Sequence, residues 1–262
     1  MKFLLISILS LLSSTVVTRS ITGTPVMSSF GQFSFDKHTQ IAWQSTPSTL
    51  KELLDLTNDI RTNPAKYAEH IQTIYIDTFE DGVVKSLNRM SNEGSVAVYT
   101  EARDFLRNAK PHPPLKLDAG LTAAAYKHSL WMSRTETMSH TGHGGSKVLD
   151  RMKEFGGLDG CCQFRWAENI VTSAPQWSAL IAILDWIIDD GVTSRGHRKN
   201  FFGPFEIVGF GLTAPTTTQK DPKWYLTQKL SLSTYVSRVD SIPEALRRES
   251  GLTEYRAQTG SW

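Results

Sequence analysis

The sequence predicts an α+β fold packed in layers, and the order of its hydrophobic patterns is the main reason. From residue 48 to residue 190, apolar residues recur mostly at helical spacing, whereas strand-like runs are concentrated between residues 206 and 236. Helices first and strands late, with no internal repeat, are typical of α+β packing. Hydrophobic residues form 40% of the 262 residues and cysteine occurs only twice, so the domain must fold on an apolar core rather than on cross-links.

The first twenty residues differ from the rest of the chain. Lys2 is followed by fifteen uncharged residues, Phe3 to Val17. A bilayer core requires about 20 apolar residues, so this run is too short for a stable membrane anchor and predicts a signal peptide, residues 1–20, cleaved near Ser20. A short signal-anchor is the alternative. We therefore expect a secreted, extracellular protein.

Charge argues against binding to nucleic acid or to anionic membranes. Of 28 basic residues, Lys2 and Arg19 fall within the expected signal peptide, which leaves 26 basic against 26 acidic residues and a net charge of zero. Without an excess of positive charge, nothing drives nucleic-acid or membrane-surface binding through bulk charge.

Three segments follow the expected signal peptide. Residues 21–47 are polar and rich in glycine, serine and threonine, and we interpret them as a linker or arm. Residues 48–240 form the predicted domain. Residues 241–262 are charged and polar, and we expect a short helix and a free tail there.

Helices are predicted from apolar spacing and from their start and stop signals. Ser48 is the expected N-cap of the first helix, which breaks at Asn63-Pro64, where the proline begins a second helix. Asp118 is the expected N-cap of a long, alanine-rich helix that ends near Thr135. The other predicted helices cover residues 98–107, 147–155 and 177–190.

Strands and loops occupy the remaining segments of the predicted domain. The predicted strands cover residues 115–117, 165–171, 206–212, 224–231 and 233–236. The segments expected to be loops are residues 76–96, the stretch from Gly156 to the adjacent Cys161-Cys162 pair, and residues 191–204. Adjacent cysteines cannot join distant segments, so this pair is a strained ring, an intermolecular bridge or two reduced thiols.

Histidine and acidic residues in segments of unusual composition are the candidate functional residues. His140 lies in a glycine-rich loop, His197 follows Gly196 after a helix, and Glu168 has apolar neighbours on both sides. An ionised carboxylate near the core is costly unless it is paired, so Glu168 requires a nearby arginine or protonated histidine, and His197 is one candidate. Two histidines and two acids in one cleft would bind a divalent metal ion or perform acid–base chemistry near neutral pH.

An ordered series of motifs over residues 48–237 resembles the CAP superfamily, also called SCP-like domains. The motifs are N-D-I-R-T-N-P-A-K-Y at 58–67, P-L-K-L-D-A-G-L-T-A-A-A-Y-K-H at 114–128, S-H-T-G at 139–142, A-E-N-I at 167–170 and D-D-G-V-T-S-R-G-H-R-K-N at 189–200. The resemblance implies a three-layer α-β-α sandwich with a large cleft lined by two histidines and two acids. The G-H-R-K-N form is similar to the non-animal branch, and the cysteine-rich extension of the venom and sperm members is absent, so ion-channel modulation is not implied.

Carried over by motif, the resemblance assigns the four cleft residues. They are His140, Glu168, His197 and, three residues after Trp186, Asp189. Aspartate replaces the usual glutamate at this fourth position, and the adjacent Asp190 is an alternative.

Other polar residues have more than one interpretation. The four cleft residues themselves could form only a structural network that holds loops to the sheet. His143 is interpreted as a loop residue and His128 as a partly buried core histidine. Arg195 and Arg198 either pair with local acids such as Asp189 and Asp190 or hold an anionic ligand.

Two function classes follow from these observations. The first is a secreted, non-enzymatic module that binds a lipid, a sterol or a divalent metal ion. The second is a metal-assisted hydrolase or peptidase, in which His140 and His197 hold zinc and Glu168 is the general base. We favour binding, because two histidines without an H-E-x-x-H helix make a poorer zinc site than metalloproteases have, and no G-x-S-x-G elbow indicates a serine nucleophile. The sequence leaves the oligomeric state open.

Overall fold

The computed structural model describes residues 49–158, 165–173 and 178–261. The predicted signal peptide, the N-terminal arm and the Cys161-Cys162 pair lie outside these residues. Within the described part of the chain, no helix is both long and apolar enough to cross a membrane.

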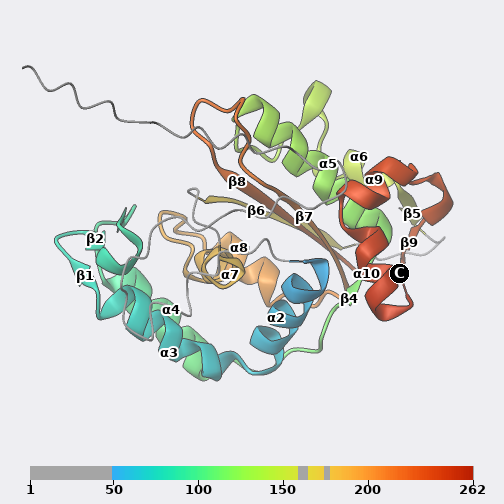
Figure 1. The fold of residues 1–262 in the computed structure, drawn as a ribbon. Helices are drawn as coiled ribbons and strands as arrows, with labels where there is room; N and C mark the ends of the chain where they lie inside the picture. Colours follow the sequence, from blue (N-terminus) through green and yellow to red (C-terminus); the bar gives the residue numbers. More distant parts are fainter. Residues whose placement is uncertain (1–48, 159–164, 174–177, 262) are drawn as a thin grey trace, which may run out of the picture. The chain divides into compact units, whose positions relative to one another are not determined.

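A four-stranded mixed sheet is the centre of the fold (Figure 1). Its strand order is β4-β7-β8-β6, with β4 parallel to β7 and the other neighbours antiparallel. The sheet consists of β4 (Lys116–Leu117), β6 (Trp166–Ser173), β7 (Ile207–Thr213) and β8 (Trp224–Ser231). These strands confirm four of the predicted strand segments to within a few residues.

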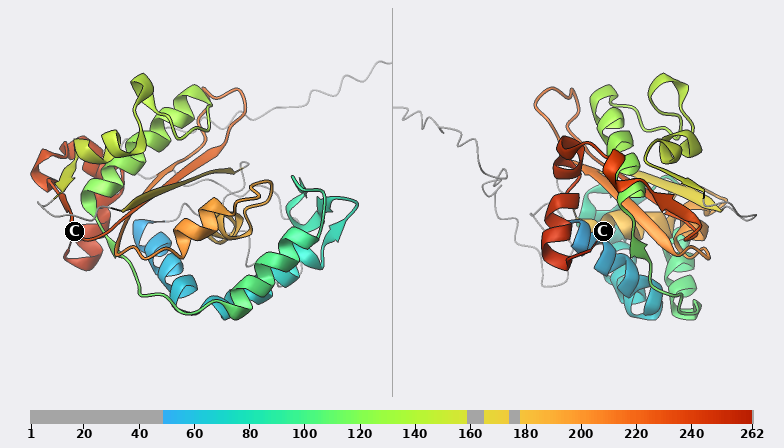
Figure 2. Two further views of the ribbon diagram at one scale, coloured as in Figure 1. Left: turned by 180° about the vertical axis from the view of Figure 1, so that it is seen from behind. Right: turned by 90° about the vertical axis from the view of Figure 1, so that its right-hand side faces the viewer.

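Helices cover both faces of this sheet, which gives three layers (Figures 1 and 2). One outer layer holds α5 (Ala119–Thr135) and α6 (Val148–Glu154), with α5 packed on β7 and β8. The opposite layer holds α2 (Leu50–Thr62), α3 (Ala68–Ile71), α4 (Ala97–Asn108), α7 (Ala179–Ile188) and α8 (Gly196–Phe201). The predicted α+β class and three-layer α-β-α sandwich are confirmed.

Side-chain caps begin the two helices for which the sequence predicted a cap. Asp118 accepts a hydrogen bond from the backbone nitrogen of Leu121 (2.8 Å) and caps α5, as predicted. The cap of α2 is Thr49 rather than Ser48, because Thr49 and Glu52 form a reciprocal capping box. The second predicted helix is a series of short turns and helices from Pro64 to Ile76.

Three segments expected to be loops contain regular structure. Residues 76–96 include a small antiparallel sheet, β1 (Phe79–Glu80), β2 (Val83–Val84) and β3 (Arg89–Met90), with Asp81-Gly82 as a two-residue turn at positive φ. The loop expected at Gly156 begins instead with β5 (Gly156–Leu158), which pairs with β9 (Tyr235–Ser237). Residues 191–204 contain α8. Each element is too short for the periodicity of its side chains to show in the sequence.

The prediction of a free C-terminal tail was wrong. Residues 241–261 form α9 (Glu244–Glu249) and α10 (Leu252–Thr259). Leu252 and Tyr255, one helical turn apart on α10, are buried in the main hydrophobic core together with Ile242. The apolar residues of this charged segment are few, but they are spaced to face one side of a helix.

Candidate functional site

His140 and Glu168 form the first histidine–acid pair of the site. His140 lies in the loop between α5 and α6, and its Nδ1 is 2.9 Å from Oε1 of Glu168 on β6. The His140 side chain is 52% exposed, whereas that of Glu168 is 1% exposed. The carboxylate therefore lies behind the ring, and the histidine is the member that a ligand can reach.

Two buried cations surround the Glu168 carboxylate. Nη2 of Arg151 on α6 lies 2.9 Å from both oxygens, and Nζ of Lys229 on β8 lies 2.5 Å from Oε2. Burial raises the pKa of Glu168, but the hydrogen bond from His140 and the charges of Lys229 and Arg151 outweigh this effect and hold the pKa well below its usual range. Glu168 is therefore ionised at neutral pH and can only accept hydrogen bonds.

His197 and Asp189 form the second pair. Asp189 follows the last residue of α7 at a φ of 58°, and its carboxylate accepts from the backbone nitrogen of His197 (2.8 Å) and contacts Nδ1 of His197 (2.6 Å). The side chain of Asp189 is 2% exposed and that of His197 is 22% exposed. As in the first pair, the acid is buried behind the ring.

Asp190 has a different role, so the fourth site residue is Asp189. The Asp190 carboxylate accepts from the backbone nitrogens of Asn92 and Glu93, both at 2.9 Å, and from the hydroxyl of Tyr99, also at 2.9 Å. These bonds join the end of α7 to the segment that follows β3. The geometry therefore does not support the alternative assignment of Asp190 as the acid beside His197.

The two histidine rings come together although they belong to opposite layers. Their centroids are 6.4 Å apart and their planes differ by 29°. Because an ionised carboxylate only accepts, Nδ1 of His140 donates to Glu168, and Nε2 is the ring nitrogen that this contact leaves for a ligand. Among the interactions of the described residues, neither Nε2 has a hydrogen-bond partner.

Strand β6 positions both halves of the site because neighbouring side chains on a strand face opposite layers. Glu168 faces α5 and α6. Asn169 faces α8, where its Nδ2 donates to the carbonyl of His197 (3.2 Å) and its Oδ1 accepts from Asn200 (2.9 Å). The A-E-N-I and G-H-R-K-N motifs thus meet at this strand.

Several expected pairings differ from those observed. Asp189, not Glu168, is the partner of His197. Arg195 pairs with Glu93 (2.6 Å) and Arg198 with Glu101 (2.8 Å), rather than with the Asp189 and Asp190 carboxylates.

Arg151 and Lys229 are site residues that the sequence interpretation missed. Lys229 had a signal, because it is the one charged residue within the apolar run at Trp224–Ser231, and a charge in a buried strand requires a partner. Arg151 had none, since it occurs in a short helix with charges at several positions.

His128 is a buried histidine next to this network. It is more deeply buried than predicted, at 1% exposure, and it stacks on Trp131 with centroids 5.7 Å apart. Its Nε2 lies 2.9 Å from the carbonyl of Ser139. Burial lowers the pKa of His128 to about 4, against an opposing effect of the Glu168 charge, so the ring is neutral at neutral pH.

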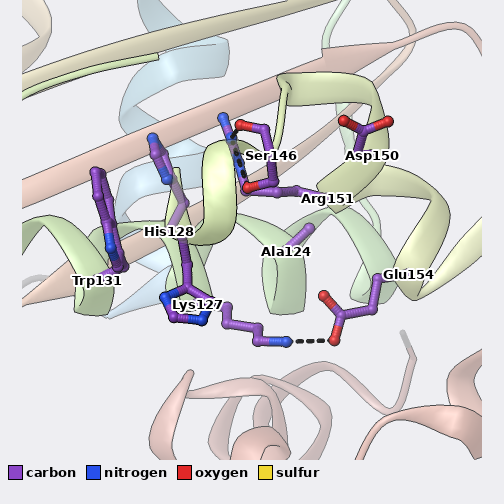
Figure 3. A pocket seen from close by; sticks show the side chains of 9 residues that line it. Ala124, Lys127, His128, Trp131, Ser146, Asp150, Arg151 and Glu154 are labelled. Carbon is purple, nitrogen blue, oxygen red and sulfur yellow. Dashed lines mark hydrogen bonds and ion pairs between the residues drawn. The ribbon is translucent and has the colours of Figure 1, made fainter. Parts of the chain in front are cut away.

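A cavity of about 160 Å³ lies between α5, the turn around His143 and α6 (Figure 3). In Figure 3 the rings of His128 and Trp131 lie side by side, and the ion pair of Lys127 with Glu154 runs along the cavity. Its lining comprises Ala124, Lys127, His128, Trp131, His143, Ser146, Asp150, Arg151 and Glu154. It does not include His140 or His197, so the paired histidines are not part of this cavity.

The donor set at the paired histidines is small. Across residues 49–158, 165–173 and 178–261, no group of three or more histidine, cysteine and acidic side chains is arranged to hold a metal ion. The two Nε2 atoms offer two ligands, fewer than the three protein ligands of catalytic zinc sites. Each ring is nevertheless oriented as in metal sites, with Nδ1 held by a carboxylate.

Comparisons with known proteins identify the family. No curated protein matches the chain. Among solved structures, it is similar to an extracellular protein containing an SCP domain from Bacillus anthracis strain Ames, with 20% identity over 56% of this chain and 43% of that chain and a TM-score of 0.35. The model of the cysteine-rich secretory protein family, CAP, matches residues 54–230, which is more than half of the sequence. The chain therefore belongs to the CAP family.

Proposed function

We propose that this protein is a secreted, non-enzymatic CAP module whose paired histidines bind a divalent metal ion, with zinc as the candidate. One observation carries the proposal. The Nδ1 atoms of His140 and His197 are each held by a buried carboxylate, at 2.9 and 2.6 Å, which leaves both Nε2 atoms without a hydrogen bond among the described residues.

Binding through only two histidines would be weak, and water or a second ligand would complete the coordination of the ion. The buried positions of Glu168 and Asp189 support roles in orienting the rings rather than in direct coordination, since both acids use their oxygens on protein donors.

A lipid or sterol is the other ligand class for this module. The cavity at His128 and Trp131 is about 160 Å³, below the roughly 300 Å³ at which small-molecule pockets begin. Charged side chains such as Lys127 and Glu154 line it. These features argue against a sterol as the ligand of this cavity.

A hydrolase with Glu168 as general base is less well supported. A general base works best when its pKa is near the working pH, whereas the pKa of Glu168 is held well below its usual range. Its side chain is 1% exposed, and both oxygens already accept bonds from Arg151, so no substrate water can approach it without breaking the network.

Secretion is proposed from two observations. The uncharged run from Phe3 to Val17 has the length of a signal peptide core, and the family to which the chain belongs is described as secretory. Cleavage near Ser20 would release a chain that retains every element described above.

Calorimetric zinc titration tests the proposed metal binding. Recovery of the protein from the medium of secreting cells tests the proposed secretion, and the N-terminal sequence of the recovered protein reports cleavage near Ser20. We expect weak zinc binding by the wild type, and its loss in the double variant His140→Ala with His197→Ala, because both available Nε2 ligands are removed.

His143→Ala is the matched control. His143 is an exposed histidine three residues from His140, and we expect this variant to bind zinc as the wild type does. Zinc binding that persists unchanged in the double variant would exclude a metal role for the pair.

A further inference from the structure

We infer that the two histidines are unequal ligands: His197 anchors the cation, His140 binds it weakly, and the buried Lys229 is the residue that sets this difference. The inference rests on the proposed function. Its basis is the net charge of the fixed groups behind each ring. This net charge differs in sign between the two histidine–acid pairs, although the pairs have the same hydrogen-bond geometry.

Behind His140, cations outnumber anions. Glu168 supplies one negative charge, and Arg151 and Lys229, both in direct contact with its carboxylate, supply two positive charges. His128 lies 3.8 Å from Oε1 of Glu168 but is neutral at neutral pH, so it does not alter the sum. The side chains of Lys229 and Glu168 are 0% and 1% exposed, so solvent and salt screen these charges little.

Behind His197, the charge is negative. No cationic side chain contacts the Asp189 carboxylate within the part of the chain that the structure describes, apart from His197 itself. Asp190 follows directly, and its carboxylate is held by backbone nitrogens and the hydroxyl of Tyr99.

The arginines near Asp189 do not reverse this sign. Arg195 donates to the backbone carbonyl of Asp189 (2.9 Å), but its charge is matched by Glu93 at 2.6 Å. Arg198 is matched by Glu101 at 2.8 Å. A divalent cation is therefore attracted at His197 and repelled, relative to that position, at His140.

Lys229 is the cation that can be replaced without removing the contacts that orient His140. Without it, Arg151 still reaches both oxygens of Glu168, and His140 still bonds to Oε1, so the orientation of the ring is retained. Removing one partner of a buried ion pair is strongly destabilising when the other charge is left unpaired, but in Lys229→Met the Glu168 carboxylate still pairs with Arg151. Lys229→Met therefore changes the charge behind His140 and leaves its support in place.

Zinc titration of the full chain at pH 7 tests the inference. We expect Lys229→Met to bind zinc more tightly, by about tenfold, because a buried positive charge near the ion is removed. A purely structural role for Lys229 predicts the opposite sign, since loss of groups that orient metal-binding histidines weakens affinity by about 10- to 100-fold.

Two further variants isolate the charge. Lys229→Arg keeps the charge, so its zinc affinity should stay near that of the wild type. Lys127→Met is the matched control, because Lys127 lies on α5, on the side of the sheet that Glu168 faces, but is half exposed and paired with Glu154 rather than Glu168. Its removal should leave zinc affinity unchanged. Unchanged or weaker binding by Lys229→Met overturns the inference.

The single histidine variants give a readout that does not depend on Lys229→Met folding. We expect His197→Ala to lose more zinc affinity than His140→Ala, and equal losses count against the inference. If the wild type binds no zinc, the proposed function fails. The inference then still predicts measurable zinc binding by Lys229→Met. If neither protein binds zinc, both the proposed function and the inference are rejected.

Discussion

Three basic side chains, those of Arg151, Lys229 and His128, are buried beside Glu168, and they meet the cost of burial differently. Burial lowers the pKa of Lys229 to about 8, and contact with Glu168 opposes this effect and keeps the amine charged at neutral pH. His128, 3.8 Å from the same carboxylate, remains neutral. Arg151 and Lys229 already place two positive charges against one carboxylate. A third cation in the same buried space would have no negative partner.

The neutral state of His128 predicts a loss of stability in mild acid. Its pKa is about 4 in the folded protein against the ordinary histidine value of 6.5, so the unfolded chain binds the proton more readily between these values. Stability from this residue is therefore complete above pH 6.5 and falls as the pH decreases towards 4, by a total on the order of 3 kcal/mol.

Denaturant unfolding of the wild type and of His128→Gln across this pH range checks the prediction. Glutamine keeps a donor for the Ser139 carbonyl but does not titrate, so the free energy of unfolding should depend less on pH between 6.5 and 4. Glu168 has a lowered pKa, so its contribution to stability begins to fall only near the ordinary glutamate value of about 4.3, at the acid end of this range, and Glu168 is present in both proteins. Equal pH slopes in the two proteins would contradict the assignment.

At the scale of elements, α5 lies very close to the backbone of β7 at two glycines. A Cβ atom at Gly209 would lie 2.2 Å from the backbone of Leu121, and one at Gly211 would lie 2.1 Å from the backbone nitrogen of Tyr126. Neither glycine has positive φ, so they are required by space rather than by backbone conformation. Alternate residues of β7 thus let the long helix lie directly on the strand.

Gly211→Ala should therefore destabilise the fold by about 2 kcal/mol or more, at the upper end of the usual cost of overpacking. Urea unfolding midpoints measure this loss. Gly157→Ala in β5 is the matched control, because a Cβ there has no neighbour within 4 Å and its φ is also not positive. Similar midpoints for the two variants would show that α5 can move away from β7 at little cost.

At the scale of the whole molecule, the C-terminal helices are part of the folded unit. Ile242, Leu252 and Tyr255 are buried in the core that also contains α2 and α7 residues, and α10 packs against α2. The N-terminal and C-terminal ends of the described chain therefore stabilise each other. A domain boundary at residue 240 would cut through this packing.

Ending the chain at residue 240 should lower the free energy of unfolding by about 5 kcal/mol, because three apolar side chains at about 1.5–3 kcal/mol each lose their burial. Leu252→Ala should give a smaller loss of about 2–5 kcal/mol, and Glu254→Ala, at an exposed position of α10, should give almost none. A shortened chain with an unchanged urea midpoint would mean that the helices are only attached to the domain.

The sequence predicts much of the fold and the identity of the site residues, but not their pairing. Long elements such as α5 and β8 have enough periodicity and capping to be located, and motif order identifies His140, Glu168 and His197. Pairing depends on which layer each loop faces. The assignment of Asp189 over Asp190 depends on the backbone turn at φ 58°, and Arg151 reaches Glu168 only because α6 packs beside β6.

The opposite orientations of Glu168 and Asn169 have a consequence for how this family can vary in length. One residue of β6 supports the histidine from the α5–α6 loop, and the next supports the segment that carries His197. One residue inserted between them would place both side chains on the same face of the strand, so only one histidine segment would keep its support. We therefore expect chains that keep both supports to vary in length in the connecting loops rather than within β6.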